Sequence, residues 1–277
     1  MRICAFCDIM ISFLSCTLII GYISLLELSM KSIINFFSEI GEVFMLLGGV
    51  IRALPRVFRD RKNLISQMSH IGVDSLPLVV LVSIFTGAIA AWQAAYQMKG
   101  LAPMSLVGGI TSRVILIELG PVLTGIIIAG RVGASIAAEL GTMKVTEQID
   151  ALDIMAISPV RYLAMPRVVA TTVMMPVLVV FSNLVAIVGA FIVSSAFLGI
   201  SQYLFFESFK NFFYLQDVFG ALLKAGIFGL STSLLGCHIG FRTDGGAEGV
   251  GISTIRSFVV SAAMILIADY ILWFFLF

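Results

Sequence analysis

The chain has 277 residues, of which 60% are hydrophobic and only 12% are charged, and its mean hydropathy is +1.09. A soluble fold of this length could not bury so much apolar surface, so the composition indicates an integral membrane protein. The net charge of +1 is uninformative for such a protein, because the placement of Lys and Arg matters and their sum does not. No long basic patch points to nucleic acid as a partner.

The first 30 residues form an apolar N-terminal extension of uncertain role. Residues 3–29 could be a sixth span, a signal-like segment without an obvious cleavage site, or an extension ahead of a true start at Met30. Residues 31–58 interrupt their apolar positions with charged and polar ones, which predicts an amphipathic helix that lies along the cytoplasmic membrane interface.

Five apolar stretches are each long enough to cross a bilayer, which takes roughly 20 helical residues. They lie at about residues 72–96, 114–138, 168–198, 218–240 and 257–277. Continuous apolar stretches satisfy their backbone groups in lipid only as helices, and the alternating pattern of a barrel is absent. We therefore predict an all-α integral membrane protein with about five spans.

Basic residues gather in three of the segments outside these spans. Arg52, Arg56, Arg59, Arg61 and Lys62 precede the first span, Lys144, Arg161 and Arg167 separate the second from the third, and Arg242 and Arg256 separate the fourth from the fifth. Cytoplasmic loops are enriched in Lys and Arg. We therefore expect these three segments in the cytoplasm and the C-terminus on the outer side.

The sequence offers no reaction chemistry. No Ser/His/Asp or paired-carboxylate arrangement is recognisable, and the two histidines are too isolated for a metal site. Residues 245–253 have the glycine spacing of a nucleotide-binding loop, but Ile252 stands where such a loop needs its phosphate-contacting lysine. We expect no catalytic site, no metal and no cofactor in this chain, so any ATP would be bound by another chain.

A polar segment between the second and third spans has the pattern of a short helix at residues 143–158. An apolar stripe is formed by Val145, Ile149, Leu152 and Ala156, and the remaining surface carries Lys144, Glu147, Gln148, Asp150 and Asp153, before Ser158-Pro159 ends the helix. Helices that rest on lipid usually carry Lys and Arg on the polar face. Because this one carries three carboxylates and one lysine, a protein partner is favoured over the lipid surface.

Residues 118–167 resemble the signature of MlaE-type (YrbE) permeases, the membrane subunits of ABC transporters that move phospholipid between inner and outer membranes. They read ELGPVLTGIIIAGRVGASIAAELGTMKVTEQIDALDIMAISPVRYLAMPR. KAGIFG at 224–229 and GGAEGVG at 245–251, followed by Asp269, resemble the rest of the pattern. The similarity covers roughly residues 31–277, which indicates one permease domain.

The resemblance implies an interfacial N-terminal helix plus five spans, in a multi-pass protein of the bacterial inner membrane. It implies a homodimer on two cytoplasmic ATPase subunits, which bind ATP and Mg, beneath a ring of MCE-domain lipid-binding proteins; many complexes add a STAS-domain subunit. Phospholipid is the implied substrate. Residues 143–158 would be the coupling helix that docks into a groove of the ATPase.

Charged residues inside the spans are the candidates for function. They are Glu118, Arg131, Glu139, Lys224 and Asp269. Because a charge inside a span costs at least ~2.5 kcal/mol, these side chains should face protein or water. Arg131 and Glu139 share a helix face with Ser135, which predicts an intramembrane polar network near the cytoplasmic end. Asp269 is a packing or pairing residue, which we group with this network. Lys224 is an alternative partner for Asp269.

The lipid path has two charged candidates, Glu118 and Lys224. The family often has Arg immediately before the Glu of ELGP, and Ile117 stands there in this chain. Glu118 and Lys224 lie near the outer ends of their spans, where a lipid headgroup would enter or leave. Their opposite signs also allow a second interpretation, in which they pair with each other and contact no lipid.

Two other classes of function are open to this sequence. A secondary transporter would place broken helices and ionisable residues at the midplane, with repeat symmetry between its halves, and no inverted repeat is evident. A membrane lipid-handling protein outside the ABC class, or a lipid enzyme, would need a nucleophile, an acid/base pair or a metal site. Recovery of a P-loop ATPase with the purified protein would distinguish these classes.

Overall fold

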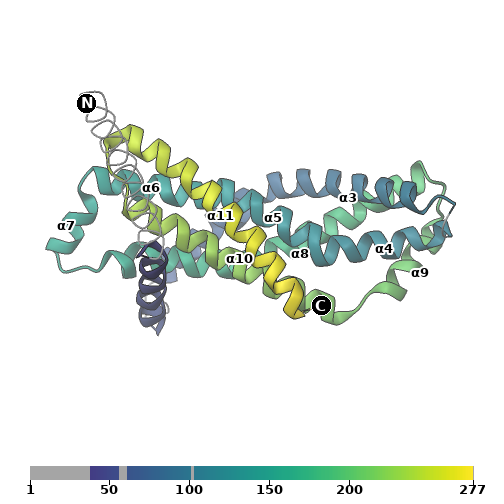
Figure 1. The fold of residues 1–277 in the computed structure, drawn as a ribbon, viewed down its shortest axis with the longest axis horizontal. Helices are drawn as coiled ribbons and strands as arrows, with labels where there is room; N and C mark the ends of the chain where they lie inside the picture. The colour runs from purple at the N-terminus through teal and green to yellow at the C-terminus, as the bar shows by residue number, and fades with distance from the viewer. Residues whose placement is uncertain (1–37, 56–60, 101–102, 277) are drawn as a thin grey trace, which may run out of the picture. The chain divides into compact units, whose positions relative to one another are not determined.

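The computed structural model describes residues 38–55, 61–100 and 103–276 (Figure 1). The chain divides by contacts into two units after Met45. The N-terminal extension at residues 1–30 and the first part of the expected interfacial helix lie outside the described residues. Within the expected range 31–58, residues 38–53 are helical.

Five helical segments of the described chain are long and apolar enough to cross a membrane. They are Arg61–Met98, Met104–Val145, Val160–Ala196, Leu215–Phe241 and Gly246–Leu276. The predicted all-α fold with five spans is therefore confirmed. Each segment begins earlier than its apolar stretch, because hydropathy marks only the part that suits lipid while the helix continues into polar sequence.

The spans are built from shorter elements. The first contains α2 (Arg61–Gly72), η2 (Val73–Ser75) and α3 (Leu76–Met98). The second contains η3 (Met104–Leu106), α4 (Val107–Val114), η4 (Ile115–Leu119), α5 (Gly120–Ile128), η5 (Ala129–Gly133) and α6 (Ala134–Val145). The third contains η6 (Val160–Ala164) and α8 (Met165–Ala196), and the last two are α10 (Leu215–Phe241) and α11 (Gly246–Leu276).

Two short helices mark the opposite ends of the bundle (Figure 1). The helix α7 (Gln148–Ile154) connects the second and third spans, and α9 (Gln202–Phe212) connects the third and fourth. The side chain of Phe205 in α9 is fully buried in an apolar cluster with residues of α3, α4, η4 and α8. This cluster fixes α9 to its end of the bundle.

Small residues bring α3 and α8 into close contact. A Cβ atom on Gly87 would lie 1.8 Å from the carbonyl oxygen of Ala186, and one on Gly189 would lie 2.4 Å from that of Ile84. The hydroxyl oxygens of Ser83 and Ser182 lie 2.8 Å apart between the same two helices. Packing of this kind associates helices in lipid, where no hydrophobic force drives them together.

Three turns of the spans are π-helical, at η4, η5 and η6. Such turns are rare and often occur at functional positions, because the extra residue redirects the side chains around it. The turn η4 contains Glu118 and the turn η5 contains Arg131. Of the three charged residues that the sequence singles out in the second span, Glu118 and Arg131 therefore lie in π-helical turns, and Glu139 lies in α6.

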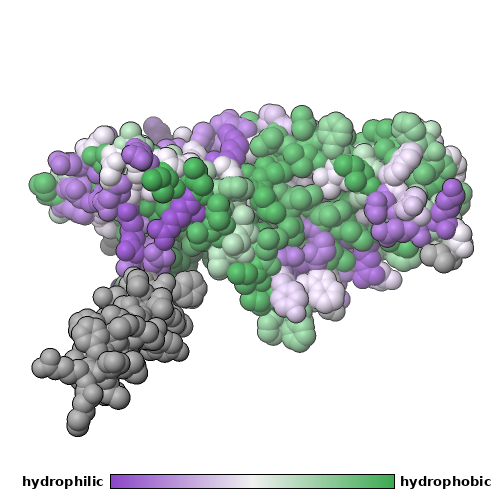
Figure 2. Space-filling view, turned by 45° about the horizontal axis from the view of Figure 1, so that its top comes forward, coloured by the Kyte–Doolittle hydropathy of each residue, from purple (hydrophilic) through white to green (hydrophobic). Residues whose placement is uncertain are grey.

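The outer surface of the bundle suits a membrane. Figure 2 shows hydrophobic residues over the middle of one face, with hydrophilic residues gathered toward the α7 end. In α11 only Ser257, Ser261 and Ile265 are buried, while bulky side chains such as Phe274 and Phe275 are exposed. This apolar surface requires lipid or another subunit to cover it.

Candidate functional site

A buried lysine joins three spans near the α9 end. The Nζ atom of Lys224 in α10 donates a hydrogen bond of 2.8 Å to Oε1 of Glu118 in η4. The same Nζ atom lies 2.9 Å from Oδ1 of Asp269 in α11. One ammonium group is thus shared by two carboxylates that come from different helices.

The three members of this triad differ in their exposure. The Lys224 side chain is fully buried, whereas the Glu118 side chain is 31% exposed and the Asp269 side chain is 18% exposed. A buried ammonium group is tolerated only when it is paired. The triad therefore neutralises Lys224 and leaves a carboxylate surface that can be reached from outside the bundle.

Asp269 pairs with Lys224, the alternative partner named from the sequence, and does not join the group of Arg131, Ser135 and Glu139 in which it was placed. The reason is its depth. Asp269 lies near the C-terminal end of α11, beside η4, whereas Arg131 lies 13 residues beyond Glu118, or roughly 20 Å farther along the second span at 1.5 Å per residue. Asp269 and Arg131 therefore belong to separate polar groups.

Arg131 belongs to the second polar group, nearer the α7 end. Its NH1 atom donates hydrogen bonds to Oγ of Ser75 and, at 3.3 Å, to the backbone carbonyl of His70. Its NH2 atom lies 3.7 Å from Oδ2 of Asp74, and that oxygen also lies 2.7 Å from Nδ1 of His70. Arg131 therefore fastens the second span to the junction of α2 and η2.

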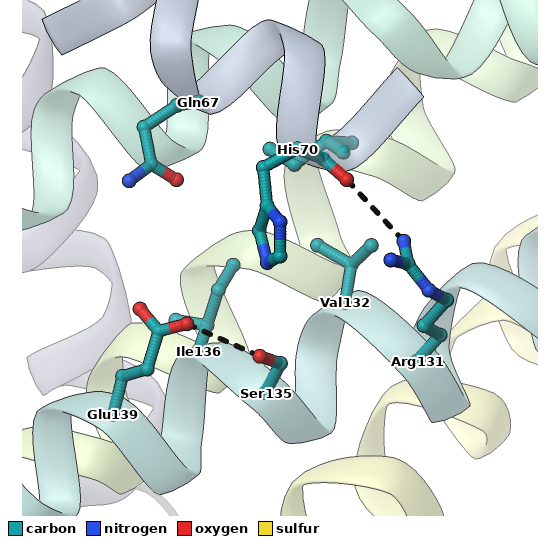
Figure 3. A pocket seen from close by; sticks show the side chains of 8 residues that line it. Gln67, His70, Arg131, Val132, Ser135, Ile136 and Glu139 are labelled. Carbon is teal, nitrogen blue, oxygen red and sulfur yellow. Dashed lines mark hydrogen bonds between the residues drawn. The ribbon is translucent and has the colours of Figure 1, made fainter. Parts of the chain in front are cut away.

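Glu139 lies two turns farther along the same helix face. Its Oε1 atom accepts a hydrogen bond of 3.2 Å from Oγ of Ser135, and its Oε2 atom accepts one of 2.8 Å from NH2 of Arg167. Arg131 and Glu139 line a common hollow with Ser135 (Figure 3), but their hydrogen bonds go to different partners. The predicted network is thus two adjacent sets of contacts.

The sequence analysis missed several partners in this region. Ser75 and Asp74 carry no signal of their own, since a hydroxyl and a carboxylate at the end of a span are common. The sequence places Arg167 among the cytoplasmic loop residues, but in the structure it lies inside α8 and is 6% exposed. Its pairing with Glu139 explains how this cation can be buried.

The predicted coupling segment has a different shape from the one expected. In place of one helix over residues 143–158, α6 continues to Val145, and α7 spans only Gln148–Ile154. Glu147 and Ala156 have positive φ angles of 59° and 58° and bound the short helix on its two sides. Ser158-Pro159 precedes the π-helical turn η6, so these residues begin the next span.

The surface of α7 is polar around an apolar tip. The exposed polar residues on and next to this helix are Glu147, Gln148, Asp150 and Asp153. The Nζ atom of Lys144 lies 2.8 Å from Oδ1 of Asp150. On the inner side Ile149 is buried, and with the partly exposed Leu152 it lines a hollow of about 220 Å³. On the outer side Ile154 is 87% exposed and Met155 is 65% exposed, a surface that a partner could cover.

These features define a five-span helical membrane protein with buried ion pairs within its spans and a short exposed helix between the second and third. The family described as Permease MlaE matches residues 64–275. The chain therefore belongs to the MlaE permease family.

Several relatives carry the same class of name. A probable ABC transporter permease protein of Synechocystis sp. is 37% identical over 244 residues, which cover 88% of this chain and 93% of the relative. One from Rickettsia felis is 36% identical over 244 residues, covering 87% and 93%. A protein of Arabidopsis thaliana named TRIGALACTOSYLDIACYLGLYCEROL 1, chloroplastic, is 36% identical over 216 residues, covering 78% and 62%. The chain is thus a multi-pass ABC transporter permease, which implies a partner ATPase and a transported substrate.

Proposed function

We propose that this permease moves phospholipids between the inner and outer membranes of a bacterium and so maintains the lipid asymmetry of the outer membrane. The observation that carries the proposal is the triad of Glu118, Lys224 and Asp269 near the α9 end. A polar group inside apolar helices suits an amphiphile, because the headgroup contacts the charges while the acyl chains contact the helices. The lipid in the name of the Arabidopsis relative supports the same class of substrate.

The pairing of Glu118 with Lys224 is compatible with a role in the lipid path. Glu118 keeps 31% of its side chain exposed, and an ionised carboxylate has about four sites for accepting hydrogen bonds. A headgroup amine can therefore bind Glu118 while Lys224 stays paired. Leu223, next to Lys224, is 52% exposed on the same helix and offers apolar surface beside the charges.

The assembly that we propose follows from the two ends of the bundle. At the α7 end, two copies of the cytoplasmic ATPase, which hold ATP and Mg, would receive the α7 helices of a permease homodimer. At the α9 end, a hollow of about 910 Å³ lined by Tyr203, Phe206 and Lys210 suits an MCE-domain lipid-binding protein. A STAS-domain subunit would complete the complex. This chain itself would bind no cofactor and catalyse no reaction.

A photocrosslinking experiment tests the lipid path. Photoreactive amino acids at Leu119 and Leu223 should form phospholipid adducts in a complex that hydrolyses ATP and transports lipid, because both positions flank the triad. Adducts would be identified by mass spectrometry. Recovery of the P-loop ATPase with the purified permease tests the ABC assignment separately. If a transporting complex forms no phospholipid adduct at either position, the triad does not lie on the lipid path.

Cysteine labelling tests the proposed orientation in the inner membrane. Single cysteines at Asp153 and at Asp244, the exposed neighbour of the buried Thr243, should react with a charged maleimide only after the inner membrane is permeabilised. A cysteine at Gly100 should react from the periplasm in intact cells. The background should lack the four native cysteines. Labelling of position 153 from the periplasm would show that the orientation of the protein is the reverse of the one proposed.

A further inference from the structure

A hollow of about 120 Å³ lies between α2 and the second span, away from the Glu118 triad. Gln67 and His70 of α2 face Ser135 and Glu139 of α6 across it, and Arg131 lies at one end (Figure 3). A single water needs roughly 10–15 Å³ by the same measure. The hollow can therefore hold a group much larger than a water molecule.

The depth of this hollow places it at the membrane boundary on the α7 side. Along the second span, Arg131 lies roughly 20 Å and Glu139 roughly 32 Å from Glu118 at 1.5 Å per residue. The hydrocarbon layer is about 30 Å thick. With Glu118 at the α9-side edge of this layer, Arg131 lies about two-thirds of the way across it, and Glu139 lies at its far edge, next to the headgroup layer.

The charged groups at the hollow are paired but not saturated. Arg131 has five N–H donors and its side chain is 29% exposed. Glu139 accepts one hydrogen bond on each oxygen, although each can accept two, and its side chain is 43% exposed. Each group can therefore bind a further partner without losing the contacts that hold the helices together.

The order of these charges matches a zwitterion. A guanidinium group at Arg131 suits a phosphate, and the carboxylate of Glu139 suits an ammonium group. The side chains of Gln67 and His70, from the opposite wall, add polar groups to the hollow. Lipids with a phosphate and a primary amine in the headgroup present both charges within one short group at this depth.

The geometry points to a binding site for a phosphate–ammonium headgroup, of the phosphoethanolamine type, in the membrane leaflet on the α7 side. The bilayer lipid is the source that the depth of the hollow favours, and a soluble phosphoethanolamine shares the same chemistry. The site is separate from the Glu118 triad and does not depend on transport, so its occupancy can be measured without ATP.

The experiment places a photoreactive amino acid at Gln67 of the permease, in complex with its ATPase. The complex is reconstituted in nanodiscs of equimolar phosphatidylethanolamine and phosphatidylglycerol, and the adducts are counted by mass spectrometry. We expect phosphatidylethanolamine adducts in excess. Arg131→Gln should lower the yield about tenfold, the factor expected for one charge-assisted hydrogen bond. Glu139→Gln should abolish the preference for phosphatidylethanolamine.

Two further variants separate binding from folding. Ser135→Leu fills the hollow without removing a charge and should abolish the adducts. Lys62→Gln removes an exposed cation on α2 that does not line the hollow and should leave the yield unchanged. Co-purification of the ATPase with each variant reports that it is folded.

The outcomes show whether the ligand comes from the bilayer or from solution, and whether the site exists at all. Adducts in nanodiscs identify a bilayer lipid. A phosphoethanolamine adduct at position 67 in detergent, with no lipid adducts in nanodiscs, would overturn the lipid source. Equal adducts in the parent, Arg131→Gln and Ser135→Leu would overturn the site itself. Adducts at Leu119 and Leu223 report on the transport path independently.

Discussion

Replacement of Lys224 by methionine is expected to destabilise the protein by about 3–5 kcal/mol, the cost of removing one partner from a buried ion pair. The Lys224 side chain is fully buried between Glu118 and Asp269. Methionine fills a similar volume but leaves two carboxylates facing each other without a cation. The loss of stability should be measured by thermal or chemical unfolding of the purified permease in detergent.

A matched substitution at an exposed lysine shows whether the loss of stability is specific to the buried Lys224. Lys210 lies on α9 and is exposed, so Lys210→Met should change the stability by no more than about 0.5 kcal/mol. Glu118→Gln and Asp269→Asn should each cost less than Lys224→Met, because Lys224 keeps one carboxylate in either variant. Equal stability of Lys224→Met and the parent would show that the three side chains do not depend on one another.

Asp269 also limits what an exchange of charges can show. An exchange of Glu118 and Lys224 would restore a simple two-residue pair. In this structure Lys224→Glu places a carboxylate beside Asp269, which creates a repulsive contact that the exchange does not relieve. The exchange therefore needs Asp269→Asn as well before its outcome can separate a structural pair from a headgroup site.

Sequence patterns were sufficient to predict the spans because the lipid bilayer dictates their length and composition. Lipid requires about 20 apolar residues and an internally satisfied backbone, so the stretch near residues 114–138 could only be a helix. The same argument identifies Glu118 and Lys224 as residues that need a partner. It does not identify that partner, because pairing across helices depends on how each helix is rotated about its axis.

The π-helical turns explain part of what the sequence could not predict. An extra residue in η4 and another in η5 rotate the following helix relative to an ideal α-helix. Arg131 and Glu139 share the predicted face, but Arg131 contacts Ser75 and His70, and Glu139 contacts Ser135 and Arg167. Nothing in the residues of these turns marks them as π-helical, so the positions of charged side chains on the second span required the three-dimensional structure.

The helix α7 shows the same limit at a smaller scale. Periodic apolar residues predicted one helix through residues 143–158, and within the predicted apolar stripe only Ile149 is buried. The pattern could not show that Glu147 adopts a left-handed conformation, since non-glycine residues do so only where their surroundings hold them. This turn separates α7 from α6 and lets the short helix protrude.

The largest effect on assembly is expected from the exposed tip of α7. Ile154→Asp should abolish binding of the partner ATPase, because Ile154 is 87% exposed and the loss of a hot-spot residue at the centre of an interface costs about 2 kcal/mol or more. The fold should tolerate the change, since the side chain makes few contacts in the permease alone. The measurement is the amount of ATPase that co-purifies with the inserted permease.

Reversal of charge on the same helix should weaken the same interaction. Glu147→Lys combined with Asp150→Lys removes two exposed carboxylates and breaks the contact of Asp150 with Lys144. An exposed pair of this kind contributes only about 0–1 kcal/mol to folding, so the variant should still insert in the membrane. Its ATPase should dissociate or lose its coupling to lipid transport.

The control for both variants is Glu248→Lys, which reverses an exposed carboxylate near the start of α11. It changes the net charge in the same direction as the double charge reversal but leaves α7 intact, so the ATPase should co-purify at the parental level. Full retention of the ATPase together with normal lipid transport in Ile154→Asp would rule out α7 as the coupling helix. Loss of the ATPase in Glu248→Lys as well would instead indicate a docking surface that extends to the segment between the fourth and fifth spans.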